Sequence, residues 1–102
     1  MPSAEVQKLI PQIQEYLATQ PVERANLFGS CSRGEETKDS DVDLLVTYID
    51  SDKISLMDIS RMMVNLSKKI NRRVDLVEDE YLRPFARPSV EHDKIMIYER
   101  AH

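Results

Sequence analysis

The stretch Leu27-Phe28-Gly29-Ser30-Cys31-Ser32-Arg33-Gly34, followed by Ser40-Asp41-Val42-Asp43-Leu44-Leu45-Val46, decides the fold and the chemistry of this chain. The two glycines of the 102-residue sequence, Gly29 and Gly34, both lie in this stretch, directly after a short apolar run. Glycine adopts backbone angles and permits close approaches that other residues do not. The sequence therefore predicts a specially shaped loop after a strand.

Gly29 and Ser30 admit two interpretations. If a short helix begins at Ser30, its free backbone N–H groups would attract phosphate oxygens, and the Ser30 hydroxyl would add a donor. A tight strand-to-helix turn capped by Ser30 explains the same residues, because serine is a preferred capping residue. Taken alone, the loop favours the simple turn.

Asp41 and Asp43 stand where the chain becomes continuously apolar. Alternate residues of a strand point to the same face, so the two carboxylates should project side by side, about 6.6 Å apart along the backbone. Such carboxylates repel one another, and burial raises the cost, but a bound divalent cation removes both problems. Hard oxygen ligands favour Mg²⁺, which shares its coordination shell with waters and substrate phosphates.

Two other interpretations of this acidic segment are weaker. A solvated acidic loop that includes Asp39 is less favoured, because Leu-Leu-Val follows the carboxylates at once. Residues 39–43 also match the first five positions of an EF-hand calcium loop. The sixth position of that loop needs glycine for its sharp turn, and here it is Leu44.

Asp75 lies within Val74-Asp75-Leu76-Val77, a short apolar run. A charged residue in such a strand is costly unless it has a partner. If this strand lies beside the one that carries Asp41 and Asp43, Asp75 completes a group of three carboxylates. The alternative is an ion pair with a nearby arginine: Arg72, Arg73 or Arg83.

Apolar periodicity predicts the remaining elements. Helices are predicted at residues 3–18, 55–70 and 84–93, and strands at residues 24–28, 42–48, 73–77 and 95–98. Pro11 predicts a kink or break near Ile10, and Ser55 with Asp58 predicts a capping box. The order of elements indicates an α/β or α+β fold with a small mixed sheet of about four strands and helices packed on it. The length predicts a single domain over residues 1–102.

Composition narrows the classes of function. A net charge of -4 disfavours a broad nucleic-acid-binding face. No apolar run approaches the roughly 20 residues that span a bilayer, and the start of the chain lacks a secretion signal. A single cysteine excludes an internal disulfide. These features favour a cytoplasmic protein. So short a chain has little room for a substrate-binding domain, so an enzyme of this size would receive its acceptor on another protein.

The combined motifs resemble a known signature. Leu27-Phe28-Gly29-Ser30 and Asp41-Val42-Asp43, with Arg33-Gly34-Glu35 and Ser40 between them and Val74-Asp75-Leu76-Val77 after them, are similar to the motifs of the DNA polymerase β-like nucleotidyltransferase superfamily. The resemblance is strongest to its minimal nucleotidyltransferases and extends over nearly the whole chain. It implies the fold of that superfamily.

The resemblance also implies a nucleotide-binding site. Gly29 and Ser30 would hold the triphosphate of a nucleotide, with ATP as the expected substrate. Arg33 would contact phosphate oxygens, or else remain a surface charge near Glu35 and Glu36.

The resemblance also assigns the metal-binding and catalytic roles to the three aspartates. Asp41 and Asp43 would ligate Mg²⁺, as one or two ions, and Asp75 would bind the catalytic ion and help accept the proton of the attacking hydroxyl. The implied reaction is an in-line attack on the α-phosphorus, with pyrophosphate leaving. Such transfers depend on positioning and charge neutralisation.

Small members of this superfamily are similar to antitoxins encoded beside HEPN-domain ribonuclease toxins. There the transferase adds AMP to a toxin tyrosine and silences the toxin, so the resemblance implies a HEPN-domain partner. A catalytically inactive antitoxin that neutralises its partner by contact is the alternative, and the presence of all three aspartates and both glycines favours an active enzyme. A transferase that modifies nucleic acid or antibiotics would need additional substrate-binding structure.

Several residues remain without an assigned role in catalysis. A basic cluster, with Arg83 and Arg87 further on, is interpreted either as a partner surface or as ordinary solvated charge; its members are Lys68, Lys69, Arg72 and Arg73. Cys31 is expected to be a small buried residue, and His92 and His102 are expected at the surface.

Overall fold

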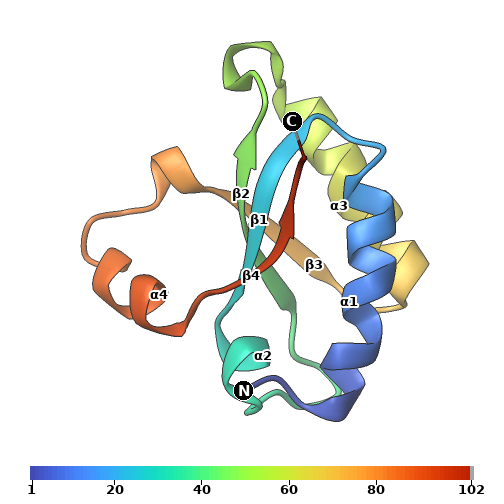
Figure 1. Cartoon of the computed structure of the whole chain (residues 1–102), viewed down its shortest axis with the longest axis vertical. Helices are drawn as coiled ribbons and strands as arrows, with labels where there is room; N and C mark the ends of the chain where they lie inside the picture. The colour runs from blue at the N-terminus through green and yellow to red at the C-terminus, as the bar shows by residue number, and fades with distance from the viewer. Residues whose placement is uncertain (102) are drawn as a thin grey trace.

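A four-stranded mixed sheet forms the centre of the computed structural model, which describes residues 1–101 (Figure 1). The strands are β1 (Val22–Phe28), β2 (Val42–Tyr48), β3 (Val74–Glu78) and β4 (Ile95–Glu99), in the order β3-β2-β1-β4. β2 runs parallel to β3, and β1 runs antiparallel to β2 and β4. The predicted mixed sheet of four strands is therefore confirmed.

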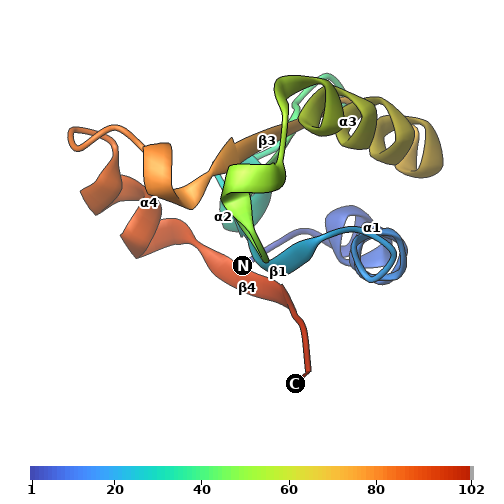
Figure 2. The ribbon, with the colours of Figure 1, turned by 90° about the horizontal axis from the view of Figure 1, so that it is seen from above.

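The helices divide between the two sides of the sheet. They are α1 (Ala4–Leu17), α2 (Ser30–Arg33), α3 (Leu56–Ile70) and α4 (Arg87–Asp93), with the 3-10 turns η1 (Ser51–Lys53) and η2 (Asp79–Tyr81). Figures 1 and 2 show α1 and α3 side by side on one side of the sheet, and α4 on the other. Among the described residues, none of the helices is both long and apolar enough to cross a membrane.

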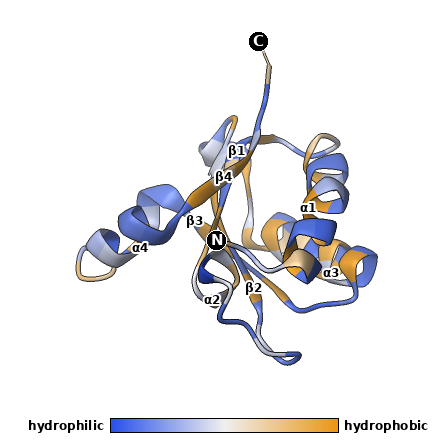
Figure 3. Cartoon of the chain, turned by 60° about the horizontal axis from the view of Figure 1, so that its bottom comes forward, coloured by the Kyte–Doolittle hydropathy of each residue, from blue (hydrophilic) through white to orange (hydrophobic). Residues whose placement is uncertain are grey.

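The alternation of β2 explains why one face of the sheet is the core and the other carries chemistry. Val42, Leu44 and Val46 are fully buried and belong to the core cluster that also contains residues of α1 and α3. Successive strand residues point to opposite faces, so Asp43 points away from this core. Figure 3 shows hydrophobic and hydrophilic residues mixed along α1 and α3, as is typical of helices with one face toward a core.

Two helix predictions have different outcomes. The capping box of α3 is confirmed, because the Asp58 N–H donates to Ser55 Oγ over 3.1 Å and the Ser55 N–H donates to Asp58 Oδ2 over 2.9 Å. Pro11 predicts a kink or a break near Ile10, and the break is not observed, because α1 is continuous through Pro11. Buried residues on both sides of the proline, Val6 and Ile13, anchor the helix to the core. This packing offsets the hydrogen bond that proline cannot make.

Some element boundaries also differ from the prediction. β1 begins at Val22, two residues before the predicted start at residue 24. α4 begins at Arg87 and not at residue 84, with Pro88 in its first turn. Proline suits that position because the first N–H groups of a helix have no intrahelical acceptor. Both Pro84 and Pro88 could therefore start a helix, and the chain uses the second.

Candidate active site

The glycine loop is shaped as the sequence predicts. The chain leaves β1 at Phe28, turns at Gly29 with φ 74°, and enters α2 at Ser30. Gly34 ends α2 with φ 75° in the left-handed region. The Ser32 hydroxyl donates to the Gly29 carbonyl over 2.7 Å and braces the turn. The strand-to-helix turn is thus observed, while the predicted phosphate contacts of Gly29 and Ser30 stay a prediction.

Gly29 also joins the two sequence motifs into one site. A Cβ atom built on Gly29 would lie 2.6 Å from Asp43 Oδ2, closer than real Cβ contacts occur. Only glycine therefore lets the Asp43 carboxylate lie against this part of the backbone. Phosphates bound on the loop would consequently lie beside that carboxylate.

Sheet register brings Asp43 and Asp75 together. Asp43 and Asp75 are Cα partners in the parallel pairing of β2 with β3, so both side chains point to the same face. Asp41 directly precedes β2 and, with Asp75, lines an open groove of about 470 Å³ at the β3 edge of the sheet. None of the ion pairs seen among the described residues involves Asp75, so the alternative pairing with an arginine is not observed.

The three aspartates also influence one another electrostatically. Burial first, and then the negative charges of Asp75 and Asp41, together raise the pKa of the Asp43 carboxyl to about 6. The charged form of Asp43 is therefore destabilised in this site. A cation placed beside Asp43 would stabilise its charged form against both burial and the neighbouring negative charges.

The donor set fits a hard divalent cation in an open arrangement. Asp41 Oδ1 is buried and has no hydrogen bond. Arg73 Nε lies 3.0 Å from that oxygen, which is an ion pair by distance but lacks hydrogen-bond geometry. The Arg73 side chain is 81% exposed, so this pair is weak. An unsatisfied carboxylate oxygen beside the destabilised carboxylate of Asp43 is suited to Mg²⁺.

The carboxylates do not enclose an ion by themselves. Within residues 1–101, no three His, Cys, Asp or Glu side chains come close enough together to hold a metal. Asp41 contacts Arg73, and Asp75 is exposed on the edge strand. Mg²⁺ commonly takes only one or two protein carboxylates and completes its shell with waters and substrate phosphates. The open arrangement fits that coordination, and the assignment of the three ligands stays a prediction.

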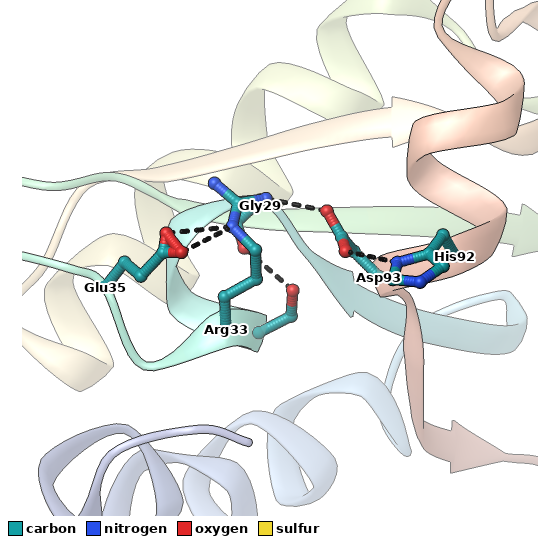
Figure 4. A network of polar contacts seen from close by, with 6 residues as sticks. Gly29, Arg33, Glu35, His92 and Asp93 are labelled. Carbon is teal, nitrogen blue, oxygen red and sulfur yellow. Dashed lines mark hydrogen bonds and ion pairs between the residues drawn. The ribbon is translucent and has the colours of Figure 1, made fainter.

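Arg33 is held in an ion-pair network that the sequence predicted only in part. Its Nη1 donates to Asp93 Oδ2 over 2.7 Å, and its Nε lies 3.2 Å from Glu35 Oε2 (Figure 4). The Glu35 contact matches the surface-charge interpretation, whereas Asp93, at the end of α4, was not anticipated. Hydrogen bonds from His92 and Arg33 lower the pKa of the Asp93 carboxyl. This network links α2 to α4, so a phosphate contact by Arg33 would have to share its guanidinium with these carboxylates.

Arg72 is a supporting residue that sequence reasoning missed. Its Nη2 donates to the carbonyl of Ser40 over 2.9 Å and to that of Thr37 over 3.1 Å. It therefore holds the loop that leads directly into Asp41. Cys31 supports the same position, because its buried Sγ lies 3.4 Å from the Asp41 carbonyl, in agreement with its prediction as a small buried residue.

The other predicted surface residues can now be placed. Lys69 pairs with Glu15 over 3.1 Å, and Arg87 pairs with Asp79 and Glu91. His92 is exposed, as expected. His102 lies outside the described residues.

Comparison with known proteins places these features in a family. Residues 11–102 match the family model described as "Polymerase beta, Nucleotidyltransferase". A candidate protein adenylyltransferase of Methanocaldococcus jannaschii, MJ1379, is 32% identical over 72 residues, which cover 70% of this chain and 72% of the relative.

Two solved structures share the fold. A candidate minimal nucleotidyltransferase is 30% identical, with a TM-score of 0.75 and coverage of 93% of this chain and 95% of the other. A tri-AMPylated Shewanella oneidensis HEPN toxin in complex with its MNT antitoxin matches with a TM-score of 0.71 at 18% identity, covering 93% of this chain and 73% of the matched chain. At that identity the second likeness concerns the fold alone.

Proposed function

This chain belongs to the polymerase β nucleotidyltransferase family, and on that premise we propose that it transfers AMP from ATP to a hydroxyl group on a partner protein. The observation that carries the proposal is the pairing of Asp43 with Asp75 beside the turn at Gly29. A triphosphate held at this turn would therefore lie next to the carboxylates.

The residues divide into those that bind the nucleotide and those that act on the acceptor. The backbone at Gly29 and Ser30 binds the triphosphate, with Arg33 as a further phosphate contact. Asp41, Asp43 and Asp75 hold Mg²⁺, which when bound neutralises phosphate charge and favours displacement at phosphorus. This division of roles requires the glycine loop and the aspartates of β2 and β3 to keep their positions relative to one another.

Asp75 is the residue best placed to meet the acceptor. It is exposed, whereas Asp43 is half-buried on the inner strand. Asp75 accepts the proton of the incoming hydroxyl, whose oxygen forms a bond to the α-phosphorus while the bond to pyrophosphate breaks. Catalysis then depends mainly on positioning and charge.

The partner we propose is a HEPN-domain toxin, and the chain would act as its antitoxin in the cytoplasm. Two findings support this. MJ1379 is named for protein adenylylation, and a structural neighbour is an MNT antitoxin bound to an AMPylated HEPN toxin. Because Asp75 lies on the open edge of the sheet, a protein acceptor could approach it directly.

A second candidate function is neutralisation of the partner by contact alone. It is favoured by the contact of Asp41 with Arg73 and by the absence of a three-ligand metal cluster among the described residues. This alternative predicts that the aspartates are dispensable for protection against the toxin.

Labelled ATP distinguishes the two functions. The protein is incubated with Mg²⁺, a candidate HEPN-domain partner protein, and ATP labelled at either the α- or the γ-phosphate. Label should reach the partner from the α-position only, and Asp41→Ala and Asp43→Ala should abolish transfer, whereas Asp52→Ala at an exposed distant site should not. Transfer from the γ-position would contradict the proposed reaction. Full protection by both aspartate variants without any transfer would favour contact alone.

A further inference from the structure

A groove between α3 and β3 shares two aspartates with the candidate active site. It has a volume of about 470 Å³ and contains Asp41 and Asp75. Its remaining lining residues come from α3 and from the segment that enters β3: Met63, Val64, Ser67, Lys68, Arg73 and Val74. An acceptor that enters along this groove would therefore reach Asp75 beside these side chains.

The helix side of the groove offers an unusual apolar contact. Val64 lies in the middle of the amphipathic helix α3, yet its side chain belongs to the exposed apolar residues of the chain, at 51%. Met63 beside it is only partly buried against the core. The groove thus combines an accessible apolar wall with the carboxylates at its end.

Two cations border the same groove and are available to a partner. Lys68 makes no ion pair with any described residue, and the single ion pair of Arg73 is with Asp41. Their neighbours in the basic cluster are already engaged, since Lys69 pairs with Glu15 and Arg72 holds the loop before Asp41. Of the four clustered cations, the two that line the groove are therefore Lys68, which has no ion pair with any described residue, and Arg73, which pairs only with Asp41 in the part of the chain that the structure describes.

We propose that this groove binds the acceptor segment of the partner protein. The segment would carry the acceptor hydroxyl, an apolar side chain against Val64, and an acidic side chain beside Lys68. Val64 and Lys68 are four residues apart in α3, so they lie on the same face of the helix and can contact one short segment together. The inference rests on the proposed function and adds the chemical character of its acceptor.

Charge decides between the macromolecules that could occupy the groove. A nucleic acid needs a broad basic face for its phosphates, whereas this chain has a net charge of -4 and the groove offers only Lys68 and Arg73 as cations. A protein segment can place its acidic side chain beside Lys68 and keep its neutral hydroxyl beside Asp75. Complementary charge at such an edge mainly increases association and selects partners.

Two short peptides test the charge preference. Each carries one central tyrosine next to a leucine, with flanking glutamates in one peptide and flanking lysines in the other. Binding is followed by fluorescence anisotropy and transfer by label from α-labelled ATP. The acidic peptide should bind about threefold to tenfold more tightly, the range expected for one or two exposed ion pairs, and Lys68→Glu should reverse the preference. Lys8→Glu, an exposed lysine of α1, is the matched control.

The partner protein provides the second measurement. Val64→Asp and Lys68→Glu should raise the KM for the partner several-fold without changing kcat at saturation or the ATP-dependent rise in melting temperature. Met57→Asp, on an exposed residue of the same helix, should change neither. If both groove variants keep the parent's KM for the partner and the parent's preference between the two peptides, the docking inference is overturned while the proposed function stands. If ATP with Mg²⁺ neither raises the melting temperature nor labels the partner, both are overturned.

Discussion

Replacing Asp43 with asparagine should make the protein more stable, although it removes a residue central to the site. Burial and two neighbouring carboxylates raise the pKa of Asp43 from 3.8 to about 6. At 1.36 kcal/mol for each pH unit, the charged form costs about 3 kcal/mol at neutral pH. Because Asp43 is partly exposed, solvent screening reduces this to about 1.5 kcal/mol. Asp43→Asn keeps the shape and removes the charge.

The sign of the pH dependence follows from linkage. The folded protein holds a proton on Asp43 more tightly than the unfolded chain between pH 3.8 and about 6. The stability of the parent is therefore complete below the lower value and falls as the pH rises through the higher one. The gain from Asp43→Asn should appear at pH 8 and vanish near pH 4.

Thermal denaturation followed by circular dichroism measures this difference, with divalent cations chelated. At pH 8 the variant should melt about 5 to 10 °C above the parent, and Asp52→Asn, an exposed control, should shift stability by less than about 0.5 kcal/mol. Adding Mg²⁺ with ATP should stabilise only the parent and the control. A variant no more stable than the parent at pH 8, or equally stabilised at pH 4, would refute the electrostatic cluster.

Three further substitutions probe the parts that support the site. Gly29→Ala should lower the free energy of unfolding by more than about 1 kcal/mol, because φ at this residue is 74° and Asp43 Oδ2 occupies the space of the new Cβ. Thermal denaturation measures this loss, and an unchanged melting temperature would show that the loop adapts. Arg72→Met should weaken Mn²⁺ binding about tenfold, measured by electron paramagnetic resonance, because the substitution releases the loop before Asp41. An equal loss of affinity in the control Lys69→Met would argue against this specific role. Ser55→Ala should cost about 1 kcal/mol in urea denaturation through loss of the α3 cap, and it should leave ATP binding intact; a weakened affinity for ATP would contradict the separation of cap and site.

The pairing of Asp43 with Asp75 was predictable because the two strands share a local pattern. Val42-Asp43-Leu44 and Val74-Asp75-Leu76 place a carboxylate between residues that must face the core. Once both apolar pairs are buried in neighbouring parallel strands, the register Val42↔Val74 places the aspartates side by side. Hydrophobic periodicity thus predicts the pairing at the centre of the candidate site as well as the sheet.

Contacts between distant side chains could not be predicted in this way. Arg33 and Asp93 are separated by 60 positions, and their pairing depends on how α4 lies relative to α2. The contact of Asp41 with Arg73 depends on side-chain rotation, which periodicity does not address. Pro11 shows a third limit, since tertiary packing maintained a helix that local propensity would interrupt.

A titration with Mn²⁺ as a substitute for Mg²⁺, in the presence of a non-hydrolysable ATP analogue, tests most directly whether Asp41, Asp43 and Asp75 act as one metal site. Electron paramagnetic resonance reports the free ion. The parent should bind the ion together with the nucleotide, and Asp43→Asn and Asp75→Asn should each weaken this binding at least about tenfold. Binding by Asp75→Asn with the affinity of the parent would contradict the three-carboxylate site.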